Sequence, residues 1–112
     1  MNKVSLTGRL TNDAKMLDWG NSNRYALKFT LAVDREYKNA NGEKEADFIP
    51  VIYFISNSTN LTKYLVKGKL VAVTGRLNVY SFTNEDNSKK YYTNVEADEI
   101  QFLDNKKKEE AV

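Results

Sequence analysis

Residues 25–34 alternate between apolar and polar or small side chains, and this alternation constrains the fold more than any other feature of the chain. The odd-numbered positions form an apolar row: Tyr25, Leu27, Phe29, Leu31 and Val33. A repeat of two residues places these side chains on one face of a β-strand, whereas a helix would scatter them around its axis. The segment therefore predicts a half-buried strand whose apolar face needs a core to cover it.

Four further segments have the composition of strands: residues 3–10, 47–55, 70–82 and 89–103. The Asn-Gly step at 41–42 predicts a hairpin turn between the second and third strands. The third strand is apolar at nearly every position, which is expected where a barrel interior or a subunit partner covers both faces.

A short helix is predicted between the third and fourth strands. Residues 56–59 offer N-cap side chains, and Gly68 supplies a C-terminal stop. Leu61, Tyr64 and Leu65 share one helical face between these ends. The order of three strands, one helix and two strands predicts an all-β protein, a five-stranded oligonucleotide-binding (OB) fold barrel with one short helix between strands 3 and 4.

Local breaks in the strand pattern carry their own predictions. Gly8 permits a sharp bend in the first strand, and Gly75 breaks the fourth strand into two parts. Pro50 predicts a sheet edge or a bulge, because proline cannot donate a ladder hydrogen bond. Residues 11–23 are predicted to form a loop or an irregular strand extension.

The chain of 112 residues has the length of one domain, which we place at residues 1–103, followed by a short charged flexible tail at residues 104–112. There is no cysteine and no histidine, which excludes a disulfide framework, thiolate metal sites and the commonest general base. No apolar run reaches the ~20 residues that span a bilayer. We therefore expect a cytoplasmic protein without a metal or other cofactor.

The charge balance argues against binding by electrostatics alone. Seventeen basic residues face fifteen acidic ones, a net charge of +2, whereas aromatic residues make up 12% of the chain. Sequence-independent binding of nucleic acid depends largely on phosphate neutralisation, so such a chain must cluster its cations or use another contact. Stacking of bases on aromatic side chains is that other contact.

Seven short motifs, taken in order, resemble the bacterial and phage single-stranded DNA-binding proteins across residues 2–103. They are N-K-V at 2–4, G-R-L at 8–10, F-T-L-A-V at 29–33, A-D-F at 46–48, Y-L-V-K-G at 64–68, L-V-A-V-T-G-R-L at 70–77 and Q-F-L at 101–103. The resemblance implies sequence-independent binding and protection of single-stranded DNA during replication, recombination, repair or DNA transfer, by base stacking and phosphate contacts.

Stacking positions of this family fall here on four aromatic residues: Tyr37, Phe48, Phe54 and Phe82. Tyr80 lies beside Phe82 at the mouth of a polar turn and is added to them. From the pattern alone, Phe48 and Phe54 fit a core as well as a binding surface, since strand aromatics are core residues by default. The basic residues expected to follow the phosphates are Arg35, Lys38, Lys63, Lys67, Lys69, Arg76 and Lys89.

The resemblance also implies a homotetramer, or else a dimer, in which residues 3–10 contribute to assembly. Two features depart from the family. Residues 78–81 read Asn-Val-Tyr-Ser and carry no basic side chain for phosphate. The chain ends in K-K-K-E-E-A-V rather than an acidic tip closed by Pro-Phe, as in either a short variant or a truncated chain. Recruitment of replication and repair partners through such a tip is therefore not assumed.

Three other functions fit parts of the sequence. A metal-dependent nuclease would need carboxylates that converge on Mg²⁺, and no pattern singles out Asp34, Glu45 and Asp47 for that role. A replication-restart or protein-interaction module with weak DNA binding, and an oligosaccharide-binding barrel, share the predicted fold. We expect a binding protein and not an enzyme.

Overall fold

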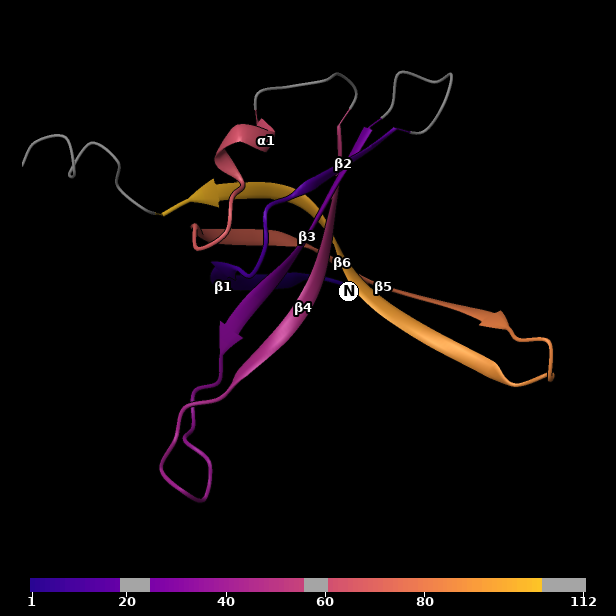
Figure 1. The fold of residues 1–112 in the computed structure, drawn as a ribbon, viewed down its shortest axis with the longest axis horizontal. Helices are drawn as coiled ribbons and strands as arrows, with labels where there is room; N and C mark the ends of the chain where they lie inside the picture. The colour runs from indigo at the N-terminus through magenta and orange to yellow at the C-terminus, as the bar shows by residue number, and fades with distance from the viewer. Residues whose placement is uncertain (19–24, 56–60, 104–112) are drawn as a thin grey trace, which may run out of the picture.

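The computed structural model describes residues 1–18, 25–55 and 61–103. Strands dominate this part of the chain, and the helix has a single turn (Figure 1). The elements are β1 Val4–Leu10, β2 Lys15–Asp18, β3 Tyr25–Asp34, β4 Ala46–Ile55, α1 Leu61–Tyr64, β5 Leu70–Thr83 and β6 Lys89–Phe102.

Five of the strands close into a ring. The sheet order is β1-β5-β6-β4-β3-β2, and β3 also pairs with β1, which joins the two ends of the row β1-β5-β6-β4-β3. The β4–β6 pairing is parallel and the others are antiparallel. The predicted five-stranded OB-fold barrel is therefore confirmed. The short β2, which lies in the stretch expected to be a loop or a strand extension, attaches to the outside of the ring at β3.

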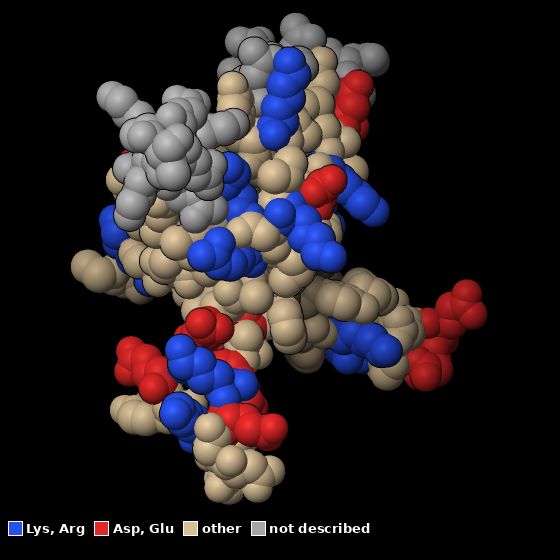
Figure 2. All heavy atoms as spheres, turned by 60° about the vertical axis from the view of Figure 1, so that its left-hand side comes forward, with Lys and Arg blue, Asp and Glu red and all other residues tan. Residues whose placement is uncertain are grey.

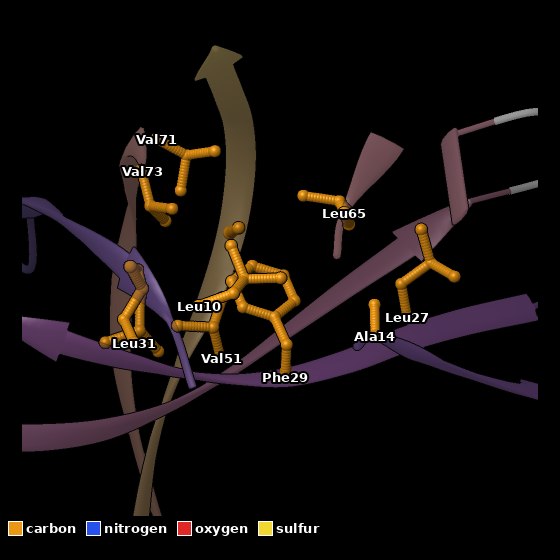
Figure 3. Packing of buried hydrophobic residues seen from close by; sticks show 11 residues of the cluster. Leu10, Ala14, Leu27, Phe29, Leu31, Val51, Leu65, Val71 and Val73 are labelled. Atoms are coloured by element: carbon orange, nitrogen blue, oxygen red, sulfur yellow. The ribbon is translucent and has the colours of Figure 1, made fainter. Parts of the chain in front are cut away.

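The alternation in β3 supplies the core as predicted. Leu27, Phe29 and Leu31 are at most 3% exposed and point into the barrel, where Figure 3 shows them among side chains from the other strands. These neighbours include Leu10, Val51, Val71, Val73 and Val95. Full burial of one such side chain contributes about 1.5–3 kcal/mol, so the ring is held mainly by apolar packing.

One end of the barrel is closed by α1 and the residue after it. Leu65 is fully buried in the core, and its amide donates to the carbonyl oxygen of Leu61. Its own carbonyl accepts a hydrogen bond from the amide of Ala14. The predicted helix stop at Gly68 is wrong, because α1 ends at Tyr64. Gly68 has a φ of 89° in a separate turn, which the hydrogen bond from the Lys69 amide to the Val66 carbonyl oxygen closes. The predicted N-cap residues 56–59 lie outside the described residues.

The ring closes at Gly8, where β1 passes close to β3. A Cβ at this position would lie 2.4 Å from the carbonyl oxygen of Ala32, closer than any real side chain approaches backbone. The predicted bend therefore has a physical cause: the absence of a side chain lets the first strand pair with β5 along its length and with β3 at its end.

Two expectations about strand breaks were only partly right. β5 continues through Gly75 instead of ending there, and the irregularity is a bulge between Thr74 and Gly75. Pro50 is exposed in the middle of β4 and lies opposite Thr30 of β3, but the pairing of β4 with β6 starts only at Val51. At Pro50 that side of β4 is locally an edge, which is why proline is tolerated.

Two hairpins extend beyond the ring in different directions (Figure 1). The first joins β3 to β4 through residues 35–45, with Gly42 at a φ of 79° as the Asn-Gly step predicted. We call the second, formed by the outer halves of β5 and β6 and the turn at residues 84–88, the arm. The long pairing from Gly75 with Ala97 to Thr83 with Lys89 holds it together.

An ion-pair cluster fastens the base of the β3–β4 hairpin. Arg35 donates to Asp47 from both Nε (3.0 Å) and Nη2 (2.8 Å), and its Nη1 lies 3.3 Å from Glu45 Oε1. The hydrogen bond from the guanidinium holds the pKa of the Asp47 carboxyl below its ordinary value. All three side chains are about half exposed, so the cluster stabilises the hairpin locally rather than the whole barrel.

Replacement of Gly8 by alanine tests the closure of the ring. The added methyl group meets the backbone of Ala32, so β1 and β3 must separate, at a cost of about 1–3 kcal/mol or more. Urea denaturation should show a lower free energy of unfolding for Gly8→Ala. Ser5→Ala, an exposed change on the same strand, is the control and should unfold like the wild type. Equal midpoints for all three proteins would contradict the closure argument.

The Arg35–Asp47 pair predicts a pH dependence. Because the native pKa of Asp47 is lowered, the pair stabilises the fold above the unfolded-state pKa, and this contribution is lost as the pH falls through the lowered native pKa. An NMR titration of the Asp47 carboxyl carbon should have its midpoint at higher pH in Arg35→Gln than in the wild type. Lys38→Gln, in the same hairpin, should leave the midpoint in place.

Candidate nucleic-acid interface

The outward face of β4 carries exposed aromatic side chains. Alternation along the strand turns Ile49, Val51 and Tyr53 toward the core, and therefore Phe48 and Phe54 away from it. Phe48 is 67% exposed and Phe54 is 42% exposed, so neither is a core residue. The ambiguity left by the sequence pattern is thereby resolved in favour of an exposed surface.

A ladder of three stacked rings lies along one face of the arm. Tyr92 of β6 is sandwiched between two residues of β5, with ring centroids 5.7 Å from Tyr80 and 5.2 Å from Phe82. The rings of Phe82 and Tyr92 are inclined by only 8°. Each of the three side chains is between 42% and 48% exposed. The arrangement is a preformed aromatic surface, open to solvent on a rigid hairpin.

The ladder and Phe48 face the same side of the sheet. β4 and β6 pair in parallel at Val51 with Val95, and Phe48 and Tyr92 each precede these residues by three positions. Beyond this pairing the strands separate into the two hairpins (Figure 1). The ring stack therefore lies on the arm and Phe48 lies on β4 toward the β3–β4 hairpin, on the same face of the sheet. Phe54 lies on the barrel body between the two hairpins and β2.

The cations predicted for phosphate contact divide into distinct groups. Arg76 lies on the aromatic face, where its Nη2 is 3.0 Å from Glu96 Oε2 across the strand pair. Arg35 lies on the side of β3–β4 opposite to Phe48, paired with Asp47 and Glu45. Both guanidinium charges are thus already balanced by carboxylates.

The lysines of the arm are distributed differently from the sequence prediction. Lys89 is opposite Thr83 and faces away from the ladder, on the side of Tyr91. Lys90 is the Cα partner of Phe82 and therefore lies on the aromatic face. Sequence reasoning missed both Lys90 and Tyr92, because the register of β5 against β6 decides their side. The sequence signal that could have placed them on the ladder face was the tight turn at residues 84–88, together with strict alternation of the side chains on both sides of that turn.

The remaining predicted residues lie at the two ends of the barrel. Tyr37 is 82% exposed in the β3–β4 hairpin, and Lys38 follows it. Lys63 belongs to α1, and Lys67 and Lys69 follow the helix at the opposite end. The structure brings Phe48, Phe54, Arg76, Tyr80 and Phe82 to one face, but it does not gather the lysines after the helix with them.

Charge is distributed unevenly over the surface. Figure 2 shows basic side chains over the barrel body, whereas acidic side chains gather mainly toward the hairpin ends. Among the described residues there is no group of three or more His, Cys, Asp or Glu side chains that would hold a metal ion. Asp47 and Glu45, considered for a nuclease, bind Arg35 instead. In the same part of the chain, no helix is long and apolar enough to cross a membrane.

Comparison with known proteins agrees with this geometry. The chain matches the Single-strand binding protein family over residues 1–103. It is 42% identical over 107 residues to single-stranded DNA-binding protein 1 of Clostridium acetobutylicum, covering 96% of this chain and 97% of that protein. It is 45% identical over 106 residues to single-stranded DNA-binding protein 1 of Staphylococcus aureus, covering 95% of this chain and 67% of that protein.

A solved structure shares the fold. The Plasmodium falciparum SSB in complex with ssDNA superposes with a TM-score of 0.79 at 23% identity, covering 93% of this chain and 96% of that one. The resemblance seen in the seven sequence motifs is therefore confirmed, and with it the expectation of a binding protein rather than an enzyme. The chain belongs to the single-strand binding protein family.

Proposed function

We propose that this protein binds single-stranded DNA without reading its sequence and protects it during replication, recombination, repair or DNA transfer. The observation that carries the proposal is the set of exposed aromatic rings on one face of an OB barrel: Phe48, Phe54, Tyr80, Phe82 and Tyr92. Every base has a π-face, so stacking on such rings is tolerant of sequence.

The arm provides the main stacking surface. A ring that is already stacked loses little conformational freedom when a base stacks on it, so the ladder is preorganised for binding. Tyr37 on the other hairpin and Phe54 on the barrel body extend the surface, so that a strand crossing it meets several rings in succession. Each stacked base contributes about 1–3 kcal/mol.

Phosphate contacts come from the lysines of this surface more than from its arginines. Lys38 follows Tyr37, and Lys90 lies opposite Phe82 on the ladder face. Arg76 and Arg35 would have to leave a carboxylate before binding phosphate. Lys63, Lys67, Lys69 and Lys89 are retained as candidates for a strand that continues around the barrel. The balance favours a binder dominated by stacking.

Self-assembly follows from the free edge of β1. Residues 4–8 pair with β5 on one side, and β3 joins the other side only at Arg9 and Leu10. An open strand edge is a template for pairing with another chain. Leu77 and Val79 on the back of the arm add exposed apolar surface of the kind buried in oligomers. We propose that the protein forms a homotetramer, with a dimer as the alternative. We also propose that it is cytoplasmic. Residues 1–103 form the binding domain, and residues 104–112 a charged tail.

Removal of single rings tests the stacking surface. Tyr37→Ala and Phe82→Ala should each weaken binding to fluorescent oligo-dT by about 1–3 kcal/mol, roughly 5- to 150-fold, because each removes a surface for one base. Phe82→Tyr keeps the ring and should bind like the wild type. Circular dichroism should show all variants folded. Normal affinity of the double alanine variant would overturn the stacking assignment, and a wild-type preference for duplex DNA or an oligosaccharide would overturn the function.

The assembly is tested by the mass of the free protein. Multi-angle light scattering should give four times the mass of one chain, or twice that mass if only β1 edges pair. Leu77→Ser together with Val79→Ser should reduce the mass if the back of the arm contributes to the tetramer. A wild-type protein with the mass of a single chain at micromolar concentration would contradict the proposal.

A further inference from the structure

Two lysines face each other directly on neighbouring strands. Lys15 of β2 and Lys28 of β3 are Cα partners in the antiparallel ladder, and both side chains are exposed. Side chains directly opposite each other in such a pair have Cβ atoms about 4.5–5.5 Å apart, and like charges in this position are destabilising. The pair therefore costs the free protein some stability.

No carboxylate of the described residues pairs with either lysine to relieve this repulsion. Ion pairs of the described residues include those of Arg35 with Glu45 and Asp47 and that of Arg76 with Glu96. Neither Lys15 nor Lys28 takes part in one. This contrasts with the two arginines named as phosphate contacts, whose charges are balanced. On this face the unbalanced positive charge of the barrel body lies at the lysine pair.

An open groove of about 320 Å³ runs beside the two lysines. Its wall includes Asn12, Leu17, Phe29, Thr30 and Pro50 in addition to the lysines. Thr30 and Pro50 are themselves Cα partners on β3 and β4, so the groove crosses from β2 toward β4. A mainly apolar lining beside two ammonium groups suits a ligand that combines apolar rings with a charged backbone, as a single nucleic-acid strand does.

The lysine pair lies on the same face of the sheet as the aromatic side chains. Lys28 lies opposite Ile52 of β4, and Ile52 lies opposite Glu96 of β6, which pairs with Arg76. Phe54 is two residues beyond Ile52 and lies on the same face. A diagonal neighbour of this kind is within reach of a long side chain. A strand with a base on Phe54 thus has its backbone within reach of Lys28.

We infer that Lys15 and Lys28 form a phosphate-binding site on β2–β3, which holds the sugar-phosphate backbone of single-stranded DNA where it passes Phe54. The inference rests on the proposed function and adds a polyanion site to it. Phosphate in the groove neutralises both ammonium groups, so the repulsion present in the free protein becomes a favourable contribution to binding. The DNA path then extends from the hairpins across the barrel body to β2.

Removal of the two charges should change the salt dependence of binding. Each phosphate contact to a single strand contributes about 0.7 to the slope of log K against log salt, so Lys15→Gln/Lys28→Gln should reduce its magnitude by about 1.4. Each contact also releases a counterion from the DNA, and this release should raise the affinity for oligo-dT about fivefold per lysine at 0.1 M salt. Fluorescence titration of oligo-dT across a salt series measures both quantities.

Lys44→Gln removes the same charge from the β3–β4 connection and serves as the matched control. It should change the slope by much less than Lys28→Gln. In the absence of DNA the double variant should unfold at the same urea concentration as the wild type or a higher one, because a like-charge pair has been removed. A lysine needed for structure would instead give a lower midpoint.

The outcomes separate this inference from the proposed function. Wild-type protein that binds oligo-dT, with an unchanged slope in the double variant, overturns the phosphate site and leaves the function intact. An equal loss in Lys44→Gln and Lys28→Gln assigns the effect to net charge and also overturns the site. Failure of the wild type to bind oligo-dT would overturn both the proposed function and the phosphate site. A reduced slope confined to Lys15 and Lys28 supports the site.

Discussion

The barrel closes where β1 runs between β5 and β3, and this close approach of backbones is the constraint on which the rest of the structure depends. Gly8 permits it because any Cβ would strike the carbonyl of Ala32. Gly75 plays a similar part at the β5 bulge, where a Cβ would lie 2.1 Å from the carbonyl oxygen of Glu96. With both glycines in place, five strands close around a core of Leu, Val and Phe side chains.

Closure also explains where the binding surface can form. The ring uses only part of the long strands, so the outer halves of β5 and β6 and the connection between β3 and β4 extend past the core. Aromatic side chains on these extensions have no interior to enter. Tyr80, Phe82 and Tyr92 therefore stack on one another and stay open to solvent. The same barrel that excludes them from its core holds them on the surface that we propose binds DNA.

The electrostatics of the face follow a division of roles between arginine and lysine. Arg35 fastens a hairpin through two carboxylates, and Arg76 bridges β5 and β6 through Glu96. Arginine suits such paired positions because its planar fork matches a carboxylate. In the described part of the chain Lys15 and Lys28 have no carboxylate partner, and this is where we infer the phosphate site. A chain with a net charge of only +2 can thus present a locally positive path.

The sequence by itself determined the strand order, the Asn-Gly hairpin and the core face of β3, because these depend on neighbours a few residues apart. It also identified Phe48, Phe54, Tyr80 and Phe82 as candidates. Their exposure, the pairing of Arg35 with Asp47, and the choice of Lys90 and Tyr92 over Lys89 and Tyr91 for the ladder face were decided by the tertiary structure. These features depend on strand register and ring closure, which join residues far apart in the chain. A register shift of one residue would move every side chain of the strand to the opposite face of the sheet.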